Sequence, residues 1–422
     1  MFKILVNAWK VKDIRRKLIF VGLLLLIYRL GSHIPLPGVD LTLLYGGSLD
    51  TLSTDNIFAL IAGGGYGTVF AMGIGPYITA SIIMQLLTYA IPPLERLQKE
   101  GEEGRKKINQ ITRYVAVGMA AINAAALTYS YLNTSVGSIF RHDNWLTYIM
   151  STVGMVSGTI FIMWLAEILT ERGIGNGSSF IIFANILSSL PAGVNSLRLM
   201  LGGDNLWAGI GMVAGILLIF VAVITFVVMV QEGERRIPVQ YSKKMAGRAA
   251  FGSNSSYIPI KVNIAGVMSI IFAISLLQFP QQINGFVQAE WLGTIVSYLD
   301  TTHWVGSILY VILIFMFTFF YTSFAINTTE MAENMKKNGG FIPGIRPGKP
   351  TGEYVQRTVD RMSLIGAILY SIIAIAPVIL QNVTGINLFG GTTLLIVTGV
   401  ALEFIKQLES QLLMRHYKGF LD

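Results

Sequence analysis

The sequence predicts an all-α polytopic membrane protein with ten transmembrane helices in two five-helix halves. Three observations support this prediction: basic residues alternate between loops, the composition is too apolar for a soluble globule, and long apolar stretches recur. The mean hydropathy is +0.60, and only 13% of the 422 residues are charged. A chain of this composition requires a lipid bilayer as its solvent.

The distribution of Lys and Arg predicts the topology. Six basic residues precede the first apolar stretch, and clusters of six recur at 96–113, 235–261 and 336–361, whereas 31–94 and 262–327 contain none. Because basic clusters mark cytosolic loops, both termini are predicted to be cytosolic and the number of spans to be even. The net charge of +8 is then explained by topology and by contact with anionic lipid. The apolar stretches predict ten spans, at 18–36, 70–90, 112–132, 147–168, 178–197, 207–230, 262–280, 304–326, 363–380 and 388–409.

A Gly-rich polar link near residue 200 divides the chain into two predicted domains, 1–200 and 201–422. Each domain carries five spans. An odd number of spans per half means that two related halves would be inverted relative to each other, an arrangement common in transporters and channels.

The spans contain few groups that could perform chemistry. Arg29, Glu167 and Glu403 lie towards span ends, and the four histidines fall in loops or at ends. This scarcity argues against an ion-coupled secondary transporter, which needs charge near the midplane. It also argues against an enzyme, because no catalytic or metal-ligand constellation is visible, and no cofactor or metal is expected. The run RGIGNG at 172–177 has no preceding strand, so it is interpreted as a flexible start to the fifth span rather than a phosphate loop.

The segment 56–67 (NIFALIAGGGYG) is uncharged and Gly-rich although it lies on the external side. Non-helical backbone at membrane depth is tolerated only where protein or a water-filled cavity surrounds it, so this segment is predicted to dip back into the protein. Ile74 and Ile78 follow in the second span, four residues apart and thus on one helical face. Taken alone, such a pair is typical of core packing.

Six long segments of the chain strongly resemble the SecY family, the channel subunits of the Sec protein translocon. They occur in the family's order from one end of the chain to the other: 70–87 (FAMGIGPYITASIIMQLL), 100–114 (EGEEGRKKINQITRY), 163–177 (MWLAEILTERGIGNG), 259–267 (PIKVNIAGV), 331–348 (MAENMKKNGGFIPGIRPG) and 390–403 (GGTTLLIVTGVALE). The resemblance implies two inverted, pseudo-symmetric halves forming a clamshell around an hourglass pore. The pore would open across the membrane for secreted chains and sideways for hydrophobic segments.

The resemblance also assigns a plug and a pore ring. The plug would be the apolar dip, namely Ile57, Phe58, Ala59, Leu60, Ile61, Ala62, Gly63, Gly64 and Gly65. The ring would consist of Ile74, Ile78, Ile182, Ile271 and Ile396. Ser178 departs from the family's apolar pattern, and either Phe180 compensates for it or the plug seals more of the opening.

Two further sets of residues follow from the resemblance. Thr79, Asn123 and Ser275 match a polar cluster of the lateral gate, although ordinary interhelical contacts would use the same residue types. The long basic loops 231–261 and 327–362 would dock the motor ATPase SecA or the ribosome. Arg346 matches a central docking arginine, whereas for Lys243, Lys244 and Arg248 a solvated or lipid-facing position is equally compatible.

The expected partners are SecE, SecG, SecA, the ribosome through ribosomal RNA, preprotein signal sequences and anionic lipid. The expected location is the bacterial cytoplasmic membrane. Two alternatives within the family remain open: an accessory channel for a restricted set of exported glycoproteins, and a plastid homologue. The alternative from another class is the ion-coupled secondary transporter.

Overall fold

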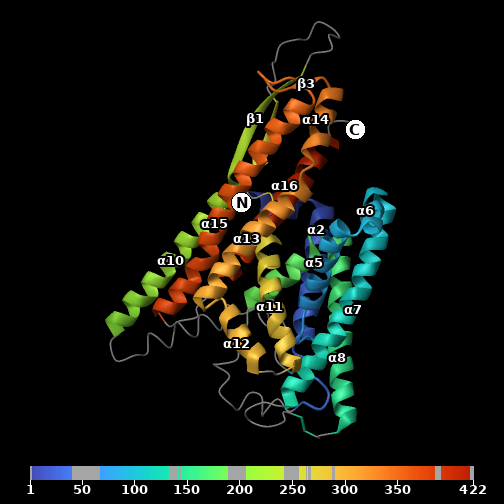
Figure 1. The fold of residues 1–422 in the computed structure, drawn as a ribbon, viewed down its shortest axis with the longest axis vertical. Coiled ribbons are helices and arrows are strands. Elements are labelled where there is room, and N and C mark those ends of the chain that lie inside the picture. Colours follow the sequence, from blue (N-terminus) through green and yellow to red (C-terminus); the bar gives the residue numbers. More distant parts are fainter. Residues whose placement is uncertain are drawn as a thin grey trace. The chain divides into compact units, whose positions relative to one another are not determined.

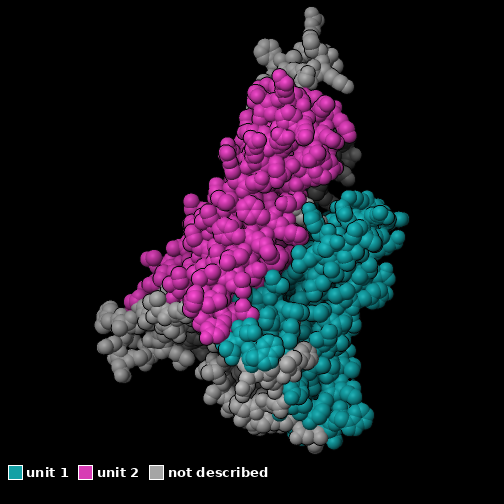
Figure 2. Space-filling model, in the orientation of Figure 1, with its two compact units in different colours: residues 1–209, 275–297, 387–422 teal, residues 210–274, 298–386 magenta. Residues whose placement is uncertain are grey.

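The computed structural model describes residues 2–39, 67–132, 140–141, 144–188, 206–241, 256–262, 264, 268–287, 290–384 and 391–418, and it is predominantly helical (Figure 1). The chain forms two compact units (Figure 2). Unit 1 comprises Met1–Gly209, Ser275–Ser297 and Asn387–Asp422, and unit 2 comprises Ile210–Ile274 and Tyr298–Ile386. The division into halves at residue 200 is a separate prediction, which this grouping does not test.

Unit 1 is built from helices. Its complete elements are α1 (Phe2–Lys10), α2 (Lys12–Gly31), α5 (Gly75–Ala90), α6 (Pro92–Lys99), α7 (Glu102–Leu132), α8 (Trp145–Arg172), the helix Gly177–Ser188 and α16 (Gly391–Lys418). The greater parts of α11 (Met268–Val287) and α12 (Glu290–Leu299) also belong to it. α5 packs on α7 and α7 on α8, and the predicted site residues Ile78, Thr79 and Asn123 lie on the first two of these helices.

Unit 2 combines membrane helices with a small sheet. It holds most of α10 (Leu206–Glu232), then β1 (Glu234–Tyr241), β2 (Ser256–Lys261), α13 (Trp304–Ala325), α14 (Thr328–Lys337), β3 (Gly340–Phe341) and α15 (Lys349–Thr384). The strand order is β2-β1-β3 and both pairings are antiparallel, with Ile237 opposite Ile258 and Gln240 opposite Phe341. An apolar core of Ile237, Val239, Ile260, Met335, Ile342, Val355, Val359 and Met362 holds the sheet against α14 and α15.

Each predicted span overlaps a described helix, and part of the fifth, 189–197, lies outside the described residues. Four helical runs are long and apolar enough to cross a membrane by length and composition: Glu102–Leu132, Trp145–Arg172, Trp304–Lys337 and Lys349–Ala376. The pair α5 and α6, bent by 98°, could supply a fifth. Three shorter apolar helices, Gly177–Ser188, Leu218–Glu232 and Met268–Gln281, lie where further spans are expected. The number of ten crossings itself stays a prediction.

The segment leading into α5 is tied firmly to the rest of unit 1. The N–H of Leu36 donates to the carbonyl oxygen of Gly67 at 2.8 Å, and the N–H of Val69 donates to that of Ile34 at 3.0 Å. Phe70 stacks on Tyr28 of α2, with ring centroids 6.0 Å apart. A Cβ on Gly31 would collide with the Phe70 ring, so glycine is required for this contact. These contacts fix the position at which α5 begins.

Candidate functional site

α5 begins later than its hydropathy predicts, because a glycine and a proline set its first turn. Gly73 adopts a φ of +52°, a backbone region that favours glycine. Pro76 lies in the first turn, where an N–H is not needed for the helix. The N–H of Ile78 donates to the carbonyl oxygen of Ile74 at 3.1 Å. The two isoleucine side chains therefore lie one turn apart on one face, and both are buried.

Ser178 lies in the first turn of the helix Gly177–Ser188 and is half-buried. Its N–H donates to Oδ1 of Asn176 at 3.0 Å, so Asn176 caps this helix end. Ile182 follows one turn later on the same face and is buried. Phe180 points elsewhere: it is buried and meets Phe404 of α16 edge to face at 5.1 Å. Phe180 is thus engaged with α16 rather than placed beside the Ser178 hydroxyl.

The remaining ring candidates lie in different units. Ile396 of α16 is buried and belongs to unit 1, like Ile74, Ile78 and Ile182. Ile271 of α11 is also buried, but it belongs to unit 2. Four candidates are therefore buried aliphatic side chains of one unit, and the closed five-member ring remains a prediction.

The three gate candidates are polar side chains on helices of unit 1. Thr79 of α5 is buried and its hydroxyl donates to the carbonyl oxygen of Gly75 at 3.2 Å, within its own helix. Asn123 of α7 is buried, and its Nδ2 has no hydrogen-bond partner among the described residues. Ser275 of α11 is half-buried. A buried amide donor without a partner is costly in an apolar surrounding, so Asn123 stands out among the three.

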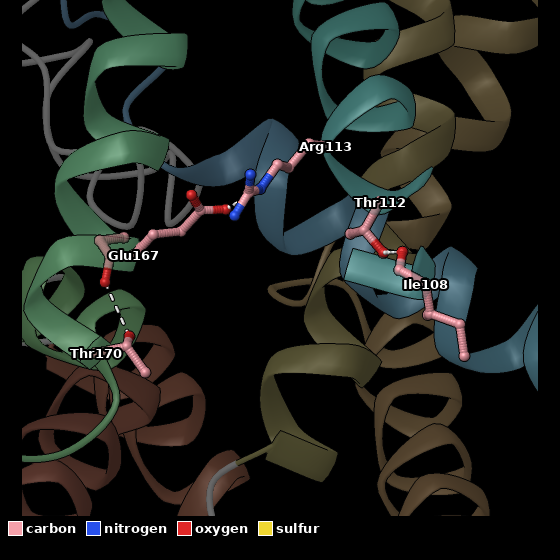
Figure 3. Close-up of polar contacts among 6 residues, drawn as sticks. Ile108, Thr112, Arg113, Glu167 and Thr170 are labelled. Carbon is pink, nitrogen blue, oxygen red and sulfur yellow. Dashed lines mark hydrogen bonds and ion pairs between the residues drawn. The ribbon is translucent and has the colours of Figure 1, made fainter. Parts of the chain in front are cut away.

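An ion pair joins α7 to α8. Nε of Arg113 donates to Oε1 of Glu167 at 2.6 Å, and Figure 3 shows the two side chains reaching towards each other from the two helices. The neighbouring Thr112 hydroxyl takes no part in this ion pair: it donates to the carbonyl oxygen of Ile108 at 2.9 Å, one turn back on α7. The sequence shows these two charges near span ends but gives no sign that they pair, because 54 positions separate them.

Arg346 is exposed on the turn between β3 and α15. Gly344 and Gly348 adopt φ values of +83° and +103°, which lets the chain reverse on both sides of the arginine. The Thr351 hydroxyl donates to the carbonyl oxygen of Arg346 at 2.9 Å. Ile342, at the start of the turn, is buried in the core beneath the sheet. The arginine is thus held on a stiff turn rather than on a loose loop.

The hairpin of β1 and β2 places a second exposed cation on this subdomain. Nε of Arg236 donates to Oε1 of Glu234 at 2.7 Å, and this hydrogen bond raises the pKa of Arg236. Its guanidinium lies 4.8 Å from the centre of the Tyr257 ring. The sequence alone predicts a loop in this region, although buried Ile237 and Val239 alternate with exposed Arg236, Pro238 and Gln240, which is the period of a strand with one buried face.

Two sets of predicted site residues lie outside the described residues. They are the plug, 57–65, and the three cations Lys243, Lys244 and Arg248.

Known proteins are similar to this chain over most of its length. The model of the SecY family matches residues 68–405. The protein translocase subunit SecY of Halalkalibacterium halodurans is 41% identical over the whole of both chains, and that of Streptomyces scabiei is 42% identical over 98% of each.

Solved structures share the fold. A structure of a protein-conducting channel superposes with a TM-score of 0.65 at 19% identity, covering 92% of this chain and 90% of the other. Sec61 in a canine ribosome-channel complex from the endoplasmic reticulum gives a TM-score of 0.62 at 19% identity, with the same coverage.

Proposed function

This chain belongs to the SecY family of protein translocase subunits, and we propose that it forms the channel through which unfolded secretory preproteins cross the membrane. Transmembrane segments of its clients leave the channel sideways into the lipid. The observation that carries this proposal is the buried aliphatic pair Ile74 and Ile78 at the start of α5, with Ile182 and Ile396 buried in the same unit.

Branched aliphatic side chains suit a channel that must accept many sequences. They offer no fixed hydrogen-bond partner, so a passing polypeptide is not held at one position. A constriction lined by them also sheds water and thereby resists ion leakage. A tight polar site would instead favour one sequence and stall the rest. Ser178 makes one part of the ring less apolar, and the plug would then contribute more to the seal.

The polar gate residues support sideways release. The Thr79 hydroxyl already donates a hydrogen bond within α5. Asn123 is therefore the candidate whose amide nitrogen can donate a hydrogen bond to another helix. Interhelical hydrogen bonds in membranes contribute about 0.6 to about 2 kcal/mol each. A gate held by bonds of that size stays closed at rest and yields to an apolar signal sequence.

Partners supply the driving force, and the chain needs no catalytic chemistry of its own. SecA or a translating ribosome would dock on the basic loops 231–261 and 327–362, with Arg346 as the principal contact and ribosomal RNA as the ribosome's acidic surface. Ribosome-bound relatives of the same fold support the ribosome as one partner. SecE and SecG would complete the channel, in the bacterial cytoplasmic membrane with both termini in the cytosol.

The transporter alternative is not favoured, because the family match covers most of the chain and midplane charge is scarce in the sequence. The accessory channel and the plastid homologue differ from a general translocase only in the proteins that they transport and in their compartment. An assay of which preproteins cross the membrane distinguishes a general translocase from an accessory channel.

The test is protease protection of a signal-bearing preprotein in proteoliposomes that hold this chain with SecE and SecG, plus SecA and ATP. We expect ATP-dependent protection with the native chain and a strong loss with Arg346→Glu, because the charge reversal repels the docked partner.

Lys106→Glu is the control, since Lys106 is an exposed cation of α7 that lies outside both proposed docking loops. It should keep most of the protection. Protection by Arg346→Glu equal to that of the native chain would remove Arg346 from the docking surface. A native complex that assembles but protects no general preprotein would favour the accessory channel.

A further inference from the structure

The external connection between α11 and α13 contains a helix, α12, that hydropathy did not reveal. Its 10 residues are too few to cross a bilayer. Trp291, Ile295 and Tyr298 recur at spacings of four and three residues, so they share one face, and they are 63%, 46% and 51% exposed. The other side carries Gly293, Val296 and Ser297, and Ser297 is exposed as well. α12 therefore projects a row of three large apolar side chains from the surface of the protein.

The end of α12 is fixed to the start of α13 by a compact turn. The Tyr298 ring meets the His303 ring edge to face at 4.9 Å. The N–H of Thr302 donates to Oδ1 of Asp300 at 3.1 Å, and the Ser307 hydroxyl donates to a carbonyl oxygen of the turn at 2.6 Å. A Cβ on Gly306 would collide with the carbonyl oxygen of Asp300. This turn leaves little freedom between Tyr298 and the first turn of α13.

The exposed apolar surface continues along α13. Trp304, Ile308, Ile312 and Met316 follow one another every four residues and are 69%, 53%, 55% and 50% exposed. The helical run that they belong to contains an 18-residue stretch with a mean hydropathy of 2.1, the highest among the four candidate spans of the described residues. Such a row on a membrane span faces lipid. The two apolar rows therefore follow each other in the chain, with only the turn at Asp300 between them.

We propose that Trp291, Ile295 and Tyr298 form a lipid-binding face that seats α12 at the boundary of headgroups and acyl chains in the external leaflet. Trp and Tyr favour this level of a bilayer. The external side follows from the absence of Lys and Arg at 262–327. α12 and its turn to α13 carry no cation, so the face binds through apolar contact rather than through anionic headgroups. Through the turn at Asp300, this contact sets the depth of the external end of α13.

The native chain contains no cysteine, which allows a spin label to be placed at one position at a time. Ile295→Cys puts the label on the proposed lipid face, and Ser297→Cys, two residues away, puts it on the polar side as a matched control. The labelled complex in phosphatidylcholine vesicles is then tested for collision with oxygen, which concentrates in lipid, and with a water-soluble nickel chelate. The oxygen-to-nickel ratio should be higher at Ile295→Cys by about threefold or more.

An oxygen-to-nickel ratio that is equally low at both positions would show that the face is in water and would overturn the proposal. A label at Ile295→Cys shielded from both reagents would also overturn it, in favour of a protein partner. The ratio should not change when phosphatidylglycerol is added, and a strong dependence would contradict apolar binding. Trp291→Cys, on the same face, should repeat the Ile295→Cys result, so failure of one variant to fold does not decide the matter.

Discussion

Two regions of unit 2 use the same aliphatic residue types in opposite ways. Beneath the three-stranded sheet, Ile237, Ile260 and Val355 are nearly inaccessible. Along α13, Ile308 and Ile312 are more than half exposed. The first set behaves as in a water-soluble protein, where burial from water drives folding. The second set needs no protein cover, because lipid tails are as apolar as the side chains themselves. Burial therefore marks the structural core only where the surroundings are water.

The largest expected effect tests this contrast directly. Ile237→Ala should destabilise the sheet subdomain by about 2 to about 5 kcal/mol, because it leaves a cavity in a packed core. Ile312→Ala should cost under about 0.5 kcal/mol, because lipid fills the space. Thermal unfolding in lipid nanodiscs, with the trypsin cleavage rate at Lys336 as a local probe, measures both. Equal losses of stability from the two substitutions would contradict the contrast between the water-facing core and the lipid-facing helix.

A third environment is the predicted pore, where buried aliphatic side chains face a passing polypeptide. Ile78→Asn should raise ion conductance of the resting channel about tenfold, because an amide in the constriction holds water. Ile271→Asn should do the same if the ring closes across the two units. Single-channel recording in planar bilayers measures the effect, and Ile78→Val is the control that keeps the seal. Unchanged conductance in both polar variants would place these residues in ordinary core packing.

The ion pair between α7 and α8 is a polar contact between two helices, in contrast to the aliphatic contacts compared above. Because both carboxylate and guanidinium are partly exposed, the pair should contribute about 1 kcal/mol or less. A double-mutant cycle with Arg113→Gln and Glu167→Gln, measured by thermal unfolding in nanodiscs, isolates that coupling. Additive losses would mean that the two helices are held by packing alone.

The smallest effect lies on the aqueous surface. The hydrogen bond from Lys99 lowers the pKa of Glu95 on α6. A lowered pKa stabilises the folded state above the ordinary carboxyl range, and the contribution disappears as pH falls through the folded value. Lys99→Gln should therefore reduce the melting temperature slightly near pH 7, and this reduction should vanish at acidic pH once Glu95 is protonated in the folded protein. A larger effect at the acidic pH would contradict this assignment.

Hydropathy predicted where the chain meets the membrane but not where its helices end. α7 begins at Glu102 rather than at 112, and α15 begins at Lys349 rather than at 363. Both helices extend beyond their apolar stretches, where polar residues continue the helix without a hydropathy signal. α5 starts at Gly75 rather than at 70 because Gly73 and Pro76 set its first turn. Helix ends of this kind depend on local backbone chemistry.

The candidate site could be predicted only in part. Ile74 and Ile78 were recognisable from spacing and resemblance, whereas the pairing of Arg113 with Glu167 depends on how two helices pack. α12 was missed because its apolar face is too short for a span and its polar side resembles a loop. The strands β1 and β2 were missed because their alternation is brief and they contain four charged residues, Glu234, Arg235, Arg236 and Lys261. Interfacial and cytosolic elements therefore need tertiary context.

The turn that holds Arg346 leads directly into one long helix. Arg346 lies three residues before α15, whose run from Lys349 to Ala376 contains 28 residues and rises about 42 Å. The same helix contributes Val355 and Val359 to the apolar core beneath the sheet and carries Tyr370, which is buried, further along. A partner that docked at Arg346, as proposed, would therefore push on the end of one stiff helix that continues into an apolar span.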